Sequence, residues 1–111
     1  MNEKLKAIKD FINSTEYYGD LDDFLDEYGD NEIFKDINAK FVKNIDSDEH
    51  RWYFIYTNVY NFTQNGEDIG DLAICEVGSL KSESMTREDA HVNIEAYSCK
   101  EIQTTSYEIV E

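Results

Sequence analysis

The chain lacks proline and has only two cysteines in 111 residues. Without proline, no loop is fixed through a constrained φ angle. Cys75 and Cys99 are too few for a disulfide framework or a cysteine-based zinc cluster, so we expect them to be core thiols in a reducing compartment. No apolar run approaches the roughly 20 residues of a membrane-spanning helix, and the N-terminal residues contain no continuous apolar core of a secretory signal. We therefore expect a cytoplasmic protein.

Positive charge is also scarce. Ten lysines and arginines face twenty-five aspartates and glutamates, which gives a net charge of -15. Direct binding of nucleic acid needs clusters of Lys and Arg that neutralise phosphates, and binding to an anionic membrane surface needs them as well. The charge balance therefore argues against both ligands and favours encounter with a basic protein surface.

The remaining composition is that of a packed globule. Hydrophobic residues make up 41% of the chain and aromatic residues 14%. This content is too high for a disordered acidic chain, and the length suits one modest core. We expect a single domain over residues 1–111.

Negative charge is concentrated between Glu16 and Glu32. This stretch has eight carboxylates in seventeen residues and no lysine or arginine. Its apolar residues recur at the i, i+3, i+4 and i+7 positions of a short amphipathic helix. They are Leu21, Phe24, Leu25 and Tyr28.

Part of this acidity has a local structural explanation. Asp20 is placed to cap the helix, Asp22 and Asp23 fall in its first turn, where the helix dipole favours negative charge, and Gly29 suits its C-cap. The surplus acids need another explanation, either a solvated face or a surface for a basic partner. The surplus is Glu16, Asp26, Glu27, Asp30 and Glu32.

Two further segments before residue 50 have a periodic pattern. Leu5, Ile8 and Ile12 predict a first helix from about Asn2 to Asn13. The apolar residues from Ile33 onward allow a helix to about Lys40, whereas residues 40–46 equally allow an opening strand.

From Arg51 the apolar period changes from 3.6 to 2, which predicts a long strand to Thr63 with both faces at least partly covered. Asn65-Gly66 is a strong type I′ turn signal, and the returning strand spans about residues 69–78. A two-residue loop aligns the partners in a defined register. The expected pairs are Phe62 with Ile69, Tyr60 with Asp71, Tyr56 with Cys75 and Phe54 with Val77.

The C-terminal third continues the pattern. Residues 80–89 are polar and predict a loop, residues 92–96 alternate as a strand, and residues 104–110 favour either another antiparallel partner or the continuation of a bent strand. The fold class is therefore α+β, with two or three N-terminal helices packed on a four- or five-stranded antiparallel sheet.

Catalytic and metal motifs are missing. Calcium loops that start at Asp20 or Asp46 fail at their fifth and sixth positions. His50 and His91 have no second ligand at the spacing of a metal site. Cys75 falls in the alternating strand, where a structural thiol in the core is expected rather than a nucleophile. A catalytic pair of carboxylates needs two different environments, usually created by burial, that separate the two pKa values. The acids of the predicted helix lie on its polar faces, so we expect no such pair. We expect no enzymatic activity, no metal and no cofactor.

The aromatic residues of the acidic stretch have two interpretations. Tyrosines among exposed acids are typical anchor residues of protein interfaces, and they equally suit packing between a helix and the sheet. The predicted partner-binding residues combine these tyrosines with the acids. They are Glu16, Tyr17, Tyr18, Asp20, Asp22, Asp23, Asp26, Glu27, Tyr28, Asp30 and Glu32.

Through the eight acids of this stretch in a compact α+β chain, the sequence resembles small acidic inhibitors of phages and mobile elements, of the anti-CRISPR and antirestriction type. Such proteins are DNA mimics, and the resemblance implies an inhibitor that blocks the nucleic-acid site of a basic protein, such as a CRISPR-Cas effector. Helical carboxylates three or four residues apart lie roughly 5–6 Å from one another and can substitute for phosphates. The alternatives are an immunity protein or antitoxin against a basic toxin, and a small-molecule-binding or enzymatic domain that uses the sheet and Cys75.

Overall fold

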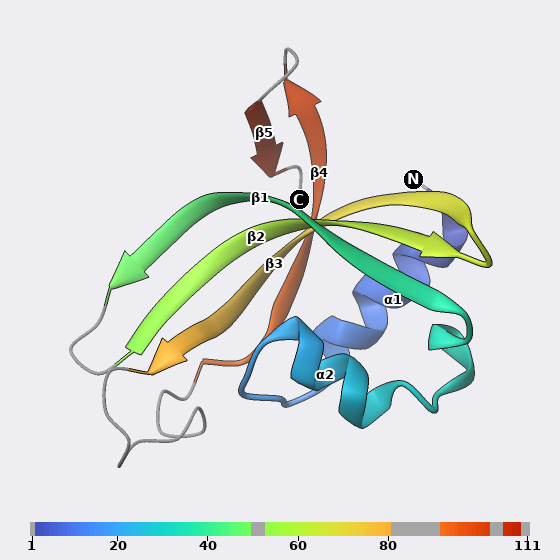
Figure 1. Cartoon of the computed structure of the whole chain (residues 1–111), viewed down its shortest axis with the longest axis horizontal. Coiled ribbons are helices and arrows are strands. Elements are labelled where there is room, and N and C mark those ends of the chain that lie inside the picture. Colours follow the sequence, from blue (N-terminus) through green and yellow to red (C-terminus); the bar gives the residue numbers. More distant parts are fainter. Residues whose placement is uncertain (1, 50–52, 81–91, 103–105, 110–111) are drawn as a thin grey trace.

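The structure is a computed structural model that describes residues 2–49, 53–80, 92–102 and 106–109. Two helices and a short 3-10 helix come first, followed by an antiparallel sheet in which five strands lie in chain order (Figure 1). The predicted α+β class is confirmed. The elements are α1 (Glu3–Ser14), α2 (Leu21–Tyr28), η1 (Glu32–Phe34), β1 (Ile37–Glu49), β2 (Tyr53–Gln64), β3 (Glu67–Leu80), β4 (Glu95–Ile102) and β5 (Ser106–Ile109).

Helix α1 forms where the apolar period predicts it. The side chain of Asn2 caps its N-terminus by accepting the backbone N–H groups of Lys4 and Leu5 at 2.8 and 3.4 Å. Leu5, Ile8 and Ile12 are buried against the sheet, as the spacing predicts.

Two asparagine side chains attach the N-terminal segment to the chain around β4. The Asn13 amide donates to the Ala96 carbonyl at 2.9 Å and accepts the Ala96 N–H at 2.7 Å. Asn93 makes the reciprocal pair with the linker after α1, since it accepts the Tyr17 N–H at 2.6 Å and donates to the Thr15 carbonyl at 3.0 Å. Each amide thus replaces a peptide group in a strand pairing, and together they fix the path of the linker that leads to α2.

The helical extension to Lys40 is wrong. The chain makes one 3-10 turn, capped by the Asn31 side chain, and buries Phe34. Asp36 then adopts a φ of 58°, which ends the turn, and β1 begins at Ile37. Residues 40–46 are therefore strand, the other possibility that the sequence left open.

The β2–β3 hairpin confirms the predicted turn and corrects the predicted register. Asn65 and Gly66 have φ values of 54° and 80°, as a type I′ turn requires. A β-bulge follows at Ile69, where Gly70 has a φ of 124°, a conformation that favours glycine. A Cβ at this position would lie only 2.7 Å from Leu5 Cδ2, so the Leu5 side chain would have to shift. From Phe62 to Ile55 every pair is shifted by one residue relative to the prediction, and a second irregularity shifts the last pair, Tyr53 with Leu80, by two, so the predicted pairs are wrong. The observed pairs include Phe62 with Gly70, Tyr60 with Leu72, Tyr56 with Glu76 and Ile55 with Val77.

Strand β4 pairs with β3 and then continues into a hairpin with β5, so residues 106–109 are a further antiparallel partner, one of the two arrangements that the sequence allows (Figure 1). The predicted strand over residues 92–96 begins too early, because β4 begins at Glu95 and residues 92–94 precede it; Ile94 and Ala96 are buried. The predicted loop lies almost entirely outside the described residues, as does Trp52 at the start of the predicted central strand.

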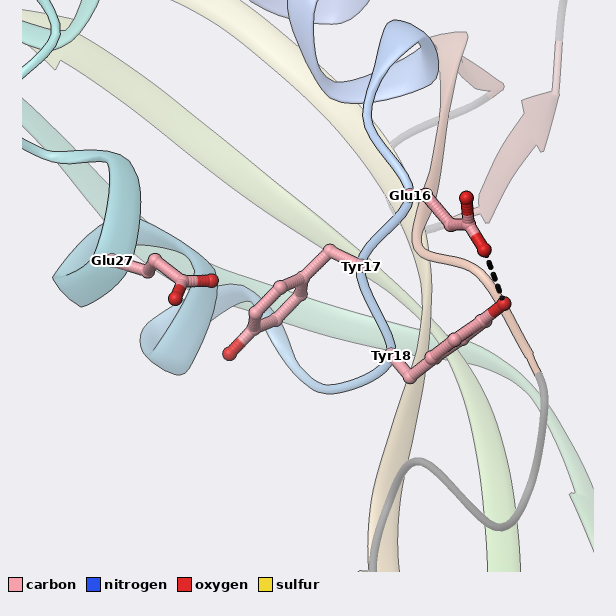
Figure 2. A pocket seen from close by; sticks show the side chains of 4 residues that line it. All are labelled: Glu16, Tyr17, Tyr18 and Glu27. Carbon is pink, nitrogen blue, oxygen red and sulfur yellow. Dashed lines mark hydrogen bonds between the residues drawn. The ribbon is translucent and has the colours of Figure 1, made fainter.

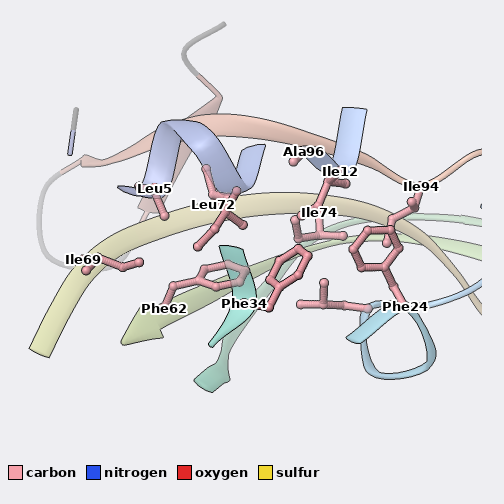
Figure 3. Close-up of a cluster of buried hydrophobic side chains, with 12 residues drawn as sticks. Leu5, Ile12, Phe24, Phe34, Phe62, Ile69, Leu72, Ile74, Ile94 and Ala96 are labelled. Atoms are coloured by element: carbon pink, nitrogen blue, oxygen red, sulfur yellow. The ribbon is translucent and has the colours of Figure 1, made fainter. Parts of the chain in front are cut away.

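The hydrophobic core lies between the helices and one face of the sheet, where side chains from α1, α2 and η1 meet those of β2, β3 and the chain at β4 (Figure 3). The opposite face also contains fully buried residues, namely Val59, Ala73 and Val77, which agrees with the expectation that both faces are partly covered. The main core consists of Leu5, Ile8, Ile12, Leu21, Phe24, Phe34, Phe62, Ile69, Leu72, Ile74, Ile94 and Ala96.

Candidate partner-binding surface

Helix α2 carries the centre of the acidic stretch, and both of its predicted ends are confirmed. The Asp20 side chain accepts the Asp23 N–H at 2.9 Å, and Asp22 and Asp23 lie in the first turn. Gly29 is the C-cap, with right-handed helical φ and ψ angles. Asp20 and Asp23 are only half-exposed, so their main role in this fold is to start the helix.

The inner side of α2 is anchored by aromatic residues. Leu21 and Phe24 are fully buried. The ring of Phe24 lies 4.7 Å from that of Tyr28 and 5.5 Å from that of Tyr17, measured between centroids. Tyr17 and Tyr28 are half-buried in this aromatic cluster, so packing accounts for much of their area.

Six of the predicted acids are exposed on α2 and beside it. Asp22 and Asp26 are four residues apart on one helix, and the turn after Tyr28 continues the row of acids. In the part of the chain that the structure describes, no lysine or arginine pairs with any of these six side chains, so their charges are not locally neutralised. The six are Glu16, Asp22, Asp26, Glu27, Asp30 and Glu32.

An open, polar hollow joins two of these acids. It has a volume of about 470 Å³ and is lined by Glu16, Tyr17, Tyr18 and Glu27. Figure 2 shows the Tyr17 ring between the linker and Glu27, while the Tyr18 ring points to the other side of the linker. The Tyr18 hydroxyl donates to Glu16 at 2.9 Å, and this hydrogen bond raises the pKa of Tyr18. The Glu16 carboxylate is therefore held with Tyr18 on the side of the linker away from Glu27 (Figure 2).

A buried glutamate that the sequence did not single out holds α2 on the sheet. Glu76 is 2% exposed and projects from β3. Its carboxylate accepts the Leu21 N–H of the first turn of α2 at 2.6 Å, the Asn58 amide at 2.8 Å and the Tyr60 hydroxyl at 2.5 Å. The acidic helix is thus fixed to the sheet through one of its free N-terminal N–H groups.

Burial in this cluster raises the pKa of Glu76, and the hydrogen bonds from Tyr60, Leu21 and Asn58 only partly oppose that effect, while the charge of Asp20 adds to it. Burial is also the largest cause of the raised pKa of Tyr60, followed by its hydrogen bond to Glu76. The Tyr60 hydroxyl therefore stays a donor at neutral pH.

The raised pKa predicts how stability depends on pH. Because folded Glu76 binds its proton more readily than the unfolded chain does, its contribution is fully present below the ordinary pKa of glutamate and is lost as pH rises through the folded value. We expect the free energy of unfolding of the wild type, relative to that of Glu76→Gln, to increase when the pH is lowered from 7 toward 5. Urea unfolding of both proteins measures this difference, and a difference that stays constant over that range contradicts it.

Both thiols are half-buried and free. The shifted register puts Cys75 on the face opposite the main core, where it is half-buried and not a core residue, and Cys99 is also half-buried. Burial raises the pKa of Cys75 and raises that of Cys99 to about 11, so both are protonated at neutral pH. Among the described residues, no cluster of three or more His, Cys, Asp and Glu side chains has the arrangement of a metal site.

Across the described segments, neither helix is long and apolar enough to cross a membrane. Comparisons of the chain with protein-family models, with curated proteins and with solved structures found no match.

Proposed function

We propose that this chain is an acidic protein inhibitor that acts in the cytoplasm, binds a basic nucleic-acid-handling protein and blocks its nucleic-acid site by charge mimicry. A CRISPR-Cas effector is one protein of this class. The observation that carries the proposal is the row of exposed acids on and beside α2, with which no lysine or arginine of the described segments pairs. A chain selected only for stability would place cations at i+4 from such acids, because like charges at this spacing repel.

The attachment of α2 supports the proposal further. Its N-terminus is held by Glu76 and its inner side by Phe24, so the row of carboxylates has a fixed position relative to the sheet. A rigid array loses little conformational freedom on binding, which leaves more of its electrostatic attraction available as affinity.

The experiment compares two variants of equal net charge. One variant, the row variant, neutralises four of the six acids, those on α2 and in the turn after it, with Asp22→Asn, Asp26→Asn, Glu27→Gln and Asp30→Asn. The matched control removes four exposed acids elsewhere, with Glu3→Gln, Asp10→Asn, Asp46→Asn and Glu67→Gln. The binding partner is first isolated with the wild-type chain as bait and identified by mass spectrometry. Its affinity for each variant is then measured at several salt concentrations.

We expect the row variant to lose at least about tenfold in affinity, together with most of its salt dependence, because close charge pairs across an interface are worth about 1.5 kcal/mol or more. The control is expected to bind nearly as the wild type does. A gel-shift competition completes the test, and a partner that binds its DNA or RNA equally well in the presence of excess inhibitor disproves charge mimicry. Inhibition of a basic toxin without competition for nucleic acid would instead identify an immunity protein or antitoxin.

A further inference from the structure

Two large apolar side chains are exposed on the edge strand β1. Phe41 is 55% exposed and Val42 is 39% exposed. Phe41 pairs with Tyr60 of β2, and the two rings meet edge to face with their centroids 6.0 Å apart. Phe41 therefore lies on the face of the sheet that α2 covers, but beyond the core.

The Glu76 cluster connects this apolar pair to the acidic helix. Tyr60, which contacts Phe41, donates to one carboxylate oxygen of Glu76, and the other oxygen accepts the Leu21 N–H. Asp22 is the next residue of α2, and its charge contributes to the raised pKa of Tyr60, after burial and the contact with Glu76. Phe41 thus contacts Tyr60, and the first turn of α2, which includes Asp22, is hydrogen-bonded to the same carboxylate that Tyr60 contacts.

The edge strand itself is unsuited to pairing with another strand. The register of β1 with β2 shifts between Phe41 and Lys43 and again between Asn44 and Asp46. Bulges and lysines on an edge strand are features that prevent strand addition. A second copy of the chain is disfavoured as the occupant as well, because each copy has a net charge of -15.

We propose that Phe41 and Val42 form the apolar centre of the partner-binding surface and that the occupant is a basic protein that places an aliphatic side chain on them and arginines on the acids of α2. Protein interfaces commonly combine such a desolvated apolar anchor with a polar rim. This inference rests on the proposed function and specifies the partner further. A surface that mimics nucleic acid through charge alone would not need an apolar anchor beside its acids.

Two synthetic peptides of equal charge test the inference on the full chain. In one, two central leucines are flanked on each side by two arginines, and in the other two glycines replace the leucines. Binding is followed by the amide chemical shifts of the isotope-labelled protein. We expect the leucine peptide to bind about fivefold more tightly and to shift the amides of Phe41, Val42 and α2. Phe41→Ser is expected to remove the difference between the peptides, and Val42→Ser to reduce it.

The outcomes separate the inference from the proposed function. If both peptides bind α2 equally well and Phe41→Ser changes neither affinity, the apolar centre is disproved while the acidic surface stands. If neither peptide binds, both proposals fail. A dimer in sedimentation analysis that Phe41→Ser dissociates also overturns the inference, since it would assign the apolar pair to self-association. Thermal unfolding of Phe41→Ser serves as the control for folding, and the exposure of Phe41 predicts little change in stability.

Discussion

Replacing Glu76 with alanine is expected to destabilise the protein by about 3 kcal/mol. The substitution leaves three donors without their acceptor, namely the Leu21 N–H, the Asn58 amide and the Tyr60 hydroxyl. A buried donor that loses its partner costs about 1–3 kcal/mol. The Leu21 N–H is buried and the other two donors are half-buried, so we expect about 1 kcal/mol for each. Removal of a buried carboxylate also relieves the desolvation that raises its pKa, which keeps the expected loss near the lower end of that sum. Urea unfolding at neutral pH measures the loss.

Glu76→Gln is the matched variant, and we expect it to lose less than Glu76→Ala. Its carbonyl oxygen still accepts the Leu21 N–H, and Tyr60 can rotate its hydroxyl to accept from the new amide. The exposed Glu67→Gln, in the same strand, is the control for loss of charge. Hydrogen exchange locates the effect. In Glu76→Ala, the exchange rates of the α2 amides should increase more than those of the α1 amides. Stability equal to the wild type would mean that desolvation of the carboxylate offsets all three hydrogen bonds.

The position of Glu76 shows where sequence reasoning fails for this fold. In β3 the residues on both faces are largely apolar, so the alternation does not decide which face meets the helices. The bulge at Ile69 decides it, because one extra residue moves every later side chain to the other face. Cys75 and Val77 therefore lie on the face opposite the helices, and Leu72, Ile74 and Glu76 lie on the face that meets the helices. Gly70 is the available sequence signal, since a glycine within a strand pattern often marks a bulge.

The elements with a single apolar stripe were predictable. Helices α1 and α2 each have one buried stripe at helical spacing, and their caps are set by Asn2 and Asp20. Three exposed acids of the candidate site, Asp22, Asp26 and Glu27, follow directly, because they occupy the remaining faces of α2. The sequence did not decide whether the tyrosines are packed or exposed. Tyr17 and Tyr28 are half-buried and contact each other, Tyr28 contacts Phe11 of α1, and both contact Phe24. Phe41 was also missed as a surface residue, because its exposure depends on where the helices end over the sheet.

Phe24→Ala is expected to cause the largest loss of stability, about 3–5 kcal/mol, as is typical when a buried phenylalanine is truncated. The side chain is fully buried, and its ring contacts four other aromatic rings. They belong to Phe11, Tyr17, Tyr28 and Phe34. Since a domain of this size is stabilised by only about 5–15 kcal/mol, the variant should unfold at a much lower denaturant concentration. Equilibrium unfolding in urea measures the change, and Phe24→Leu should lose clearly less.

Phe24 and Phe41 are expected to differ in what their substitution changes, because one is buried and the other is exposed. Phe24 belongs to α2 and is fully buried on its inner side, whereas Phe41 belongs to the edge strand β1 and is 55% exposed. Phe24→Ala should therefore lower stability strongly, and it should weaken partner binding only because α2 loses its fixed position. Phe41→Ala should change stability by less than about 1 kcal/mol and affect binding directly. If Phe24→Ala cost less than about 1 kcal/mol, its neighbouring rings would have to collapse into the cavity, and α2 would not be rigidly attached as the inhibitor hypothesis requires.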